Sequence, residues 1–292
     1  DSLALAFLSK VYSIKKRLIA KFFIVDHKLR PESTQEAKRV QNILKKHSIS
    51  SKILTWVGKK PHKNIQSIAR KKRYELLFTE SDKLKINNVL LGHHQNDLFE
   101  NFIIRMIRGS GLKGLVSLDK LKKTNGKNLL RPLINEKKDD LILVSKKVFS
   151  TYINDPTNHD EKYLRIHVRK LIKEFEKKGL DKKKFITTIK NLKHSNNVVD
   201  FYVKQNLEKN TFFSKKEDKL FLKKEYFDQP FEIIFRSLSE SIKLVGKKYN
   251  FVRGRKLNKI ISNIENNRKY KQTIGGCIIE KVSQTIIISK ER

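Results

Sequence analysis

The feature that most constrains the fold is a strand-to-helix transition between residues 89 and 111. The run from Val89 to Leu91 has the composition of a short strand buried on both faces. Two histidines follow, and beyond Asn96, a favourable helix N-cap, apolar residues recur at helical spacing. Polar side chains therefore gather where a strand ends and a helix begins, and open α/β sheets bind their ligands at such places.

The polar residues of this transition lie off the apolar stripe of the predicted helix. They are two imidazoles, two carboxylates and two guanidiniums, namely His93, His94, Asp97, Glu100, Arg105 and Arg108. The two histidines and Asp97 could be metal ligands, although adjacent residues at a strand end point to opposite sides. The alternative interpretation is that they are hydrogen-bonded residues of a turn.

The segment from Gly109 to Gly114 matches the dinucleotide-binding pattern G-x-G-x-x-G. That pattern requires a strand before it and a helix after it. Here it follows a helix, so we interpret Gly109, Ser110 and Gly111 as a helix C-terminus and loop, and we do not expect NAD or FAD.

Further strands and helices alternate on both sides of this transition. A strand at 21–25 ends in Asp26 and His27, again polar groups at a carboxyl end, and a capping box at 33–36 opens a helix. The remaining predicted elements are a strand at 52–57, a helix at 64–80 with Arg70, Arg73 and Tyr74 on one face, a loop at 119–128 and a helix at 137–147. This alternation predicts an α/β fold with a doubly wound, mostly parallel sheet.

A turn cluster at 152–158 marks an expected domain exit, which divides the chain into domains at 1–158 and 159–292. The second domain is predicted to be smaller, mainly helical and lysine-rich, and to end in a β-hairpin between 273 and 288. Arg165 and Arg169, one helical turn apart, could grip a phosphate together, or they could simply be solvated. The densest basic spot comprises Arg253, Arg255, Lys256 and Lys259.

The charge of the chain predicts a polyanionic partner. Its 292 residues carry 66 lysines and arginines against 30 acids, a net charge of +36, and nucleic acid is the default partner for such a charge. The alternative is compositional drift towards lysine. The sequence has no apolar run near the length of a membrane span, so we expect no membrane partner. The single cysteine, Cys277, excludes a CxxC site and fits a reducing cytoplasm.

The first residues, Asp1 and Ser2, lead directly into an apolar helical run at 3–8. A helix start with free amides and a serine hydroxyl suits a phosphate, although it could equally be an ordinary capped helix. The chain lacks an initiator Met and the loop that would decide between these interpretations, so we expect it to be truncated.

Taken in order, these motifs resemble the tRNA(Ile)-lysidine synthetase family of PP-loop, or N-type ATP pyrophosphatase, enzymes. Asp1-Ser2 is similar to the end of the PP-loop. The other similar segments are 25–33, 69–74, 93–100, 105–115, 131–133 and 155–165, and the 273–277 hairpin resembles the shorter form of the family, without an extra C-terminal domain. Asn96, Leu98 and Asn101 depart from the family pattern, which has Asp, Gln and Thr there.

The resemblance implies an adenine nucleotide alpha hydrolase-like fold and a two-step carbon–nitrogen ligase. ATP would adenylate carbon 2 of the wobble cytidine in the CAU anticodon of isoleucine tRNA, and free lysine would then displace AMP to give lysidine. The implied catalytic residues are Asp97, Glu100, Arg70, Arg73 and His94. ATP would contact Asp1, Ser2, Asp26, His27, Arg105, Arg108, Gly109, Ser110 and Gly111, with magnesium on Asp1 and Asp97. The tRNA would contact Arg165, Arg169, Arg253, Arg255 and Lys256.

Two other classes of protein stay open, and so does a homodimer. One is a PP-loop enzyme that thiolates tRNA, a group that uses paired cysteines or an iron–sulfur cluster, and the lone Cys277 argues against it. The other is a non-catalytic RNA-binding protein, which the charge alone would allow. Such a protein would not need acids and arginines concentrated at strand ends.

Overall fold

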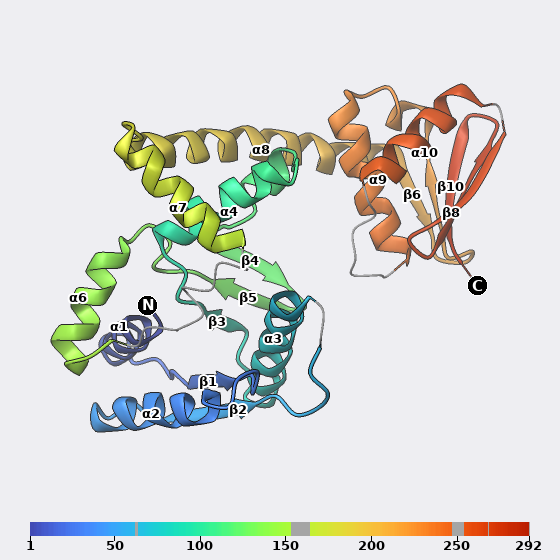
Figure 1. Ribbon diagram of the computed structural model, residues 1–292. Helices are drawn as coiled ribbons and strands as arrows, with labels where there is room; N and C mark the ends of the chain where they lie inside the picture. The colour runs from blue at the N-terminus through green and yellow to red at the C-terminus, as the bar shows by residue number, and fades with distance from the viewer. Residues whose placement is uncertain (62–63, 153–163, 247–253, 268, 292) are drawn as a thin grey trace. The chain divides into compact units, whose positions relative to one another are not determined.

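A computed structural model describes residues 1–61, 64–152, 164–246, 254–267 and 269–291 (Figure 1). The chain divides into two compact units, Asp1–Lys182 and Lys183–Arg292. The expected domain boundary after residue 158 lies outside the described residues. Compared with that expectation, the first unit also contains the helix at Leu164–Lys177, because the arginines of this helix bind a buried carboxylate of the first unit.

The first unit alternates strands with helices, as the sequence predicts. Its elements are α1 (Ser2–Lys15), β1 (Phe22–Asp26), α2 (Ser33–Lys46), β2 (Ser51–Thr55), α3 (Ile65–Lys83), β3 (Asn88–Leu90), α4 (Gln95–Ile107), α5 (Leu112–Leu115), β4 (Leu121–Thr124), β5 (Lys127–Leu130), α6 (Lys138–Phe149) and α7 (Leu164–Lys177). Strand β1 pairs in parallel with β2, and β3 pairs in parallel with β5. Strand β4 pairs antiparallel with β5.

Two apolar cores lie on the two faces of this sheet layer. Alternate residues of β1 contribute to each: Phe22 and Ile24 pack with Leu3 of α1 and Leu44 of α2, whereas Phe23 and Val25 pack on the side of α3. The α3 side also contains Leu54, Leu77, Val89 and Leu129, so residues of both parallel pairs share one core. Because the strands of each parallel pair run in the same direction, the polar residues that follow them lie at the same end of that pair.

The hairpin of β4 and β5 corrects the predicted loop at 119–128. Asn125 and Gly126 connect the strands with φ angles of 48° and 71°. Positive φ at both central residues is the geometry of a tight two-residue turn, for which Asn-Gly is the preferred pair. Strand β4 was not predicted because two of its three exposed positions are occupied by lysines rather than by apolar residues.

The second unit contains more β-structure than predicted. Its elements are α8 (Lys182–Asn210), β6 (Thr211–Ser214), β7 (Lys219–Leu222), the 3-10 turn η2 (Lys224–Tyr226), α9 (Phe231–Gly246), α10 (Gly254–Asn266), β8 (Tyr270–Ile274), β9 (Cys277–Val282) and β10 (Thr285–Lys290). The terminal hairpin forms, but it belongs to a five-stranded antiparallel sheet of order β6-β7-β10-β9-β8. Apolar residues of α9 and α10 pack with one face of this sheet in a single core. Among the described residues, no helix is both long and apolar enough to cross a membrane.

Candidate active site

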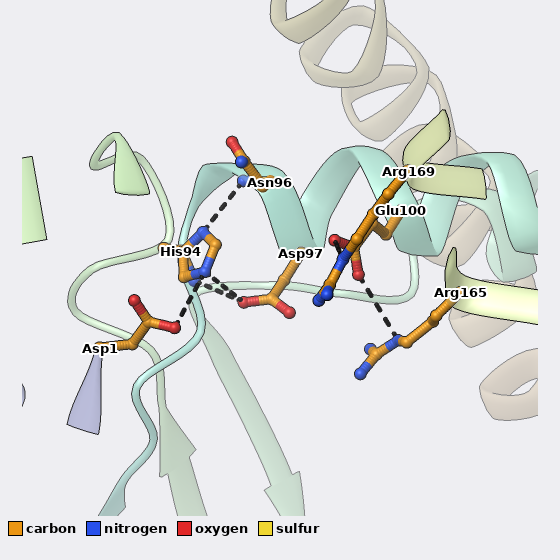
Figure 2. A network of polar contacts seen from close by, with 7 residues as sticks. All are labelled: Asp1, His94, Asn96, Asp97, Glu100, Arg165 and Arg169. Carbon is orange, nitrogen blue, oxygen red and sulfur yellow. Dashed lines mark hydrogen bonds and ion pairs between the residues drawn. The ribbon is translucent and has the colours of Figure 1, made fainter. Parts of the chain in front are cut away.

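The start of α4 is held by two hydrogen bonds of His94, one between its ring and Asn96 and one between its backbone and Asp97 (Figure 2). His94 Nδ1 accepts a hydrogen bond from the N–H of Asn96 at 3.2 Å, and the Asp97 carboxylate accepts the N–H of His94 at 3.0 Å. The prediction that Asn96 caps this helix is therefore wrong. His94 is the N-cap because its backbone is extended and its ring nitrogen supplies the acceptor.

The His94 ring is neutral and carries its proton on Nε2. Burial lowers the pKa of His94, although the nearby Asp97 acts in the opposite direction. Because Nδ1 is occupied as an acceptor, the proton of the neutral ring must be on Nε2. That nitrogen lies 3.2 Å from Asp1 Oδ2 and 3.5 Å from Asp97 Oδ2. We name Asp1, His94 and Asp97 the capping cluster.

The backbone brings the first residue of the chain to this point. A Cβ atom at Gly92 would lie 3.5 Å from both the Asp1 carbonyl carbon and the Ser2 nitrogen, so the segment after β3 runs against the start of α1. The Asp1 carboxylate contacts His94 across this junction rather than capping its own helix. The helix starts of α1 and α4 are thus side by side, and Ser2 lies between them in the first turn of α1.

One turn further along α4 lies a buried carboxylate with two cationic partners. Glu100 is 2% exposed, and its Oε1 accepts a hydrogen bond from Arg169 Nε at 2.6 Å. Arg165 Nε lies 3.6 Å from Oε2 (Figure 2). Both arginines come from α7, and their side chains remain 42% and 34% exposed for Arg165 and Arg169. The structure therefore places these two predicted tRNA contacts on a predicted catalytic residue. We name Glu100, Arg165 and Arg169 the Glu100 cluster.

Asp26 lies at the end of β1 and is held by hydroxyl groups. Its carboxylate accepts hydrogen bonds from Ser33 Oγ at 2.8 Å, Thr34 Oγ1 at 2.7 Å and the N–H of Lys28 at 2.9 Å. Burial alone would raise the pKa of Asp26, but these hydrogen bonds outweigh it and lower the pKa. The predicted capping box at 33–36 is accordingly wrong, because Ser33 and Thr34 bind this carboxylate and Glu32 is the N-cap of α2.

The next residue, His27, meets the helix α3. Arg73 Nε donates to His27 Nε2 at 3.3 Å, and the ring lies edge-on to Trp56 with 6.4 Å between centroids. Burial and the Arg73 charge lower the pKa of His27. With Nε2 as acceptor, the proton is on Nδ1, which is buried without a hydrogen-bond partner among the described residues. Such a donor favours an additional acceptor at this strand end.

Two further residues lie at these strand ends, His93, which the sequence offered only as a possible metal ligand, and Arg131, which was given no role. Burial lowers the pKa of His93 to about 4, despite Asp97, and the charges of Arg131 and Arg70 act in the same direction as burial. Arg131 follows β5, is 2% exposed and donates to the Asp119 carbonyl at 2.6 Å. Arg70 lies over the Tyr74 ring, 5.3 Å from its centroid. The sequence feature that could have identified Arg131 as a site residue is its position directly after a buried strand.

The predicted residues at the far end of α4 are not brought to these clusters. Arg108 is the C-cap of α4, followed by Gly109 with φ 64°, so this end is about 20 Å along the helix from the His94 end. Arg105, in the last turn, and Ser110 and Gly111 lie at this end too. In the second unit, Arg255 and Lys256 are exposed on α10, whereas Arg253 lies outside the described residues. The 155–163 part of the last motif is also outside them.

The described residues contain no group of three or more His, Cys, Asp and Glu side chains arranged to hold a metal ion by themselves. The capping cluster offers two carboxylates that approach one imidazole nitrogen. Magnesium usually takes only one or two carboxylates and completes its shell with water and substrate phosphates. The residues present therefore fit a magnesium ion that arrives with a nucleotide, rather than one held by protein alone.

Comparison with known proteins decides between a lysidine synthetase, a tRNA thiolase and a non-catalytic RNA-binding protein. A family model described as a PP-loop domain matches residues 1–175. The tRNA(Ile)-lysidine synthase of Orientia tsutsugamushi strain Boryong is 34% identical, over 100% of this chain and 67% of that protein. The synthase of Wolbachia pipientis wMel is 31% identical, over 100% of this chain and 68% of that protein.

The chain belongs to the tRNA(Ile)-lysidine synthase family. It is accordingly an ATP-binding ligase that modifies tRNA. Among solved structures, the U34-tRNA thiolase NcsA from Methanococcus maripaludis, with its [4Fe-4S] cluster, matches with a TM-score of 0.54 and 18% identity over 66% of each chain. At that identity the likeness concerns the PP-loop fold alone. The single cysteine of this synthase-family chain, Cys277, is buried in the core of the second unit.

Proposed function

We propose that this synthase-family enzyme performs its two chemical steps on successive turns of α4. In the first step, the carbonyl oxygen on carbon 2 of the wobble cytidine attacks the α-phosphate of ATP, and pyrophosphate leaves. In the second step, the ε-amine of free lysine attacks carbon 2, and AMP leaves with the oxygen. The observation that carries the proposal is the pair of acids on α4, the partly buried Asp97 and the buried Glu100, one turn apart with different partners.

The first step would take place at the capping cluster. The start of α1 supplies free backbone amides and the positive end of a helix dipole, both of which favour phosphate groups. Asp1 and Asp97 would hold a magnesium ion, which would supply positive charge to offset that of the leaving pyrophosphate. Neutral His94 would keep both carboxylates in place through its Nε2 proton.

The second step would take place at the Glu100 cluster. A carboxylate buried to this degree needs a cation, and its present cations are arginines whose side chains still reach solvent. The lysine ammonium group is a cation of the same charge, so it can replace one guanidinium at Glu100 without leaving the carboxylate unpaired. The amine must lose a proton before it attacks carbon 2, and Asp97 or Glu100 is the nearby base.

The cations on the α3 side would complete the site. Arg70, Arg73 and Arg131 surround strand ends that also carry the neutral rings of His27 and His93. Because the two rings are uncharged, the arginines remain the cations of this edge, and they would stabilise the phosphates and the displaced base. The wobble cytidine must leave its stack to reach them, as in other single-stranded loop recognition.

The partner would be isoleucine tRNA with a CAU anticodon, bound largely through its backbone. Arg255 and Lys256 are exposed on α10 and are available for phosphates. Lysine-based phosphate contacts release counterions, so binding should weaken steeply as salt is raised.

The decisive experiment measures AMP formation from ATP by the purified protein with lysine, with tRNA, and with both. We expect turnover only when lysine and isoleucine tRNA bearing CAU are both present, and tRNA carrying another anticodon serves as the control. Equal turnover with a sulfur donor and without lysine would instead favour a thiolase. Tight tRNA binding without ATP consumption would favour a binding protein.

A further inference from the structure

The long helix α8 exposes two aromatic rings away from the face that it buries. Its buried residues are Ile189, Asn196, Val203 and Asn206. Helical spacing places His194, Val198, Phe201, Gln205 and Lys209 opposite these residues, and Tyr202 on the flank next to Phe201. Phe201 is 57% exposed and Tyr202 is 50% exposed, which is unusual for two large rings on one helix. We name this face the aromatic stripe.

The direction of the aromatic stripe is fixed by a buried arginine on the other side of α8. Arg236 of α9 is 3% exposed, and its Nη1 donates to Asn196 Oδ1 at 2.7 Å and to Asp200 Oδ1 at 3.0 Å. These contacts fasten one face of α8 to α9. The rings of Phe201 and Tyr202 pack edge to face, with centroids 5.5 Å apart and an interplanar angle of 82°. The pair is therefore a preformed apolar surface.

The charge around the aromatic stripe indicates which class of partner would bind there. Helix α8 carries seven lysines and only two acids, Asp200 and Glu208. Both acids are already engaged, Asp200 with Arg236 at 3.0 Å and Glu208 with Lys204 at 3.5 Å. The helix therefore presents flat rings in a positive field. Unpaired nucleotides combine a polyanionic backbone with flat faces that stack on aromatic rings, whereas an acidic protein segment would supply charge without flat faces.

We propose that Phe201 and Tyr202 stack on unpaired bases of the tRNA substrate, while lysines of α8 contact the adjacent phosphates. The identity of the RNA rests on the proposed function, but the stacking surface is argued from α8 alone. In this arrangement the rings contribute sequence-tolerant binding energy that salt does not screen. The lysines contribute the salt-dependent part.

The test compares equilibrium RNA binding by the wild type and by the Phe201→Ala/Tyr202→Ala double variant, without ATP or lysine. The RNAs are unmodified isoleucine tRNA and a fully duplex RNA of matched length. For the tRNA we expect the dissociation constant to rise by roughly tenfold or more, because each lost stacking contact weakens binding severalfold. The slope of log K against log salt should stay unchanged. Duplex binding should also stay unchanged.

Two further variants control for the fold and for general loss of an exposed ring. Phe231→Ala removes a ring of α9 that is 53% exposed and should leave tRNA binding unchanged. Tyr202→Leu keeps an apolar side chain but loses the ring, so it should weaken tRNA binding severalfold even if the double variant fails to fold.

An unchanged dissociation constant for tRNA in Tyr202→Leu and in a folded double variant would overturn the inference. An equal loss with duplex RNA would also overturn it, because duplexes offer no free base faces. A failure of the proposed function would give a different experimental result. In that case the wild type would incorporate no lysine, yet tRNA binding would still depend on the two rings.

Discussion

Glu100 in the first unit and Arg236 in the second are both buried, and they are opposite in sign. Glu100 is an acid, and its partners are arginines of α7 with side chains 42% and 34% exposed. In the second unit the buried group is Arg236, which binds Asn196 and two half-exposed acids, Asp200 and Glu232. Both satisfy the rule that a buried charge needs a partner.

The two buried groups differ in how readily a ligand could replace their present partners. Arg236 joins neighbouring helices through three different acceptors, so an incoming ligand would have to replace a whole network. Glu100 is held by two cations, both from α7, and their side chains stay 42% and 34% exposed. A cationic substrate can therefore compete for Glu100. Under the proposed mechanism, the first arrangement would serve chemistry and the second would serve stability.

The largest effect is expected from Asp97→Ala, which removes an acid from the capping cluster. We expect lysine incorporation into tRNA to fall by about 1,000-fold, in the range lost with a general base, because both magnesium binding and proton removal would suffer. tRNA retention in a gel shift should persist. Asp140→Ala, an exposed acid in the first turn of α6, is the matched control and should remain active. Unchanged incorporation by Asp97→Ala would remove Asp97 from the mechanism.

Acid sensitivity is expected in the first unit, which contains His93. The pKa of His93 is about 4 in the fold, below its ordinary value of 6.5, so the unfolded chain binds this proton first as the pH falls. The stability of the first unit should therefore decline from about pH 6.5 down to about pH 4, by an amount on the order of 3 kcal/mol from this group.

Fluorescence of the single tryptophan, Trp56, reports unfolding of the first unit. His93→Gln should flatten the dependence of its unfolding free energy on pH between these limits. An identical pH dependence in the variant and the wild type would contradict the assignment of a neutral, partly buried His93.

The comparison is sharpened by Glu100→Gln, which keeps the shape of the side chain but removes its charge. We expect lysine incorporation to fall by about 100-fold, with the apparent KM for lysine raised, because the ammonium group loses its carboxylate. Stability should change by only about 1 kcal/mol, since the arginines of α7 are exposed enough to be solvated. A large loss of stability with normal turnover would make Glu100 a structural residue like Arg236.

The reverse pattern is expected for Arg236→Met. Removing the guanidinium takes away its bonds to Asn196, Asp200 and Glu232, and the second unit should lose about 2 kcal/mol of stability. Hydrogen exchange of the amides in β9 and β10 would measure this loss. The value of kcat for lysine incorporation at saturating tRNA should stay within twofold or so. A fall in kcat as large as that of Glu100→Gln would abolish the distinction between the two units.

Sequence reasoning succeeded where a long apolar pattern was followed by polar residues. The β3–α4 transition, the helix α3 and the strand β1 were all predicted, because burial on both faces and helical periodicity leave clear patterns. The sequence also grouped Asp97 and His94 correctly at the start of α4. What it could not predict was which of two neighbouring residues would cap the helix, because that choice depends on the extended backbone of His94.

Long-range contacts were the other part that the sequence could not give. Ser33 and Thr34 resemble a capping box, but their hydroxyls bind Asp26, a tertiary contact without local signature. Arg165 and Arg169 have the spacing of a phosphate clamp, and only the packing of α7 against α4 reveals their acid partner. Short strands such as β6 and β7 are missed because a segment of only four residues is too short to show a clear alternation of apolar and polar residues.

The most direct test follows two labels in single turnovers, the α-phosphate of ATP and the carbons of lysine, for the wild type and for Glu100→Gln. Without lysine, both proteins should transfer the α-phosphate label to the tRNA. When lysine is added, the wild type should lose that label as AMP and gain the lysine label, whereas Glu100→Gln should keep most of the phosphate label. If no phosphate label ever reaches the tRNA, or if both proteins take up lysine equally fast, the two turns of α4 do not carry the two steps.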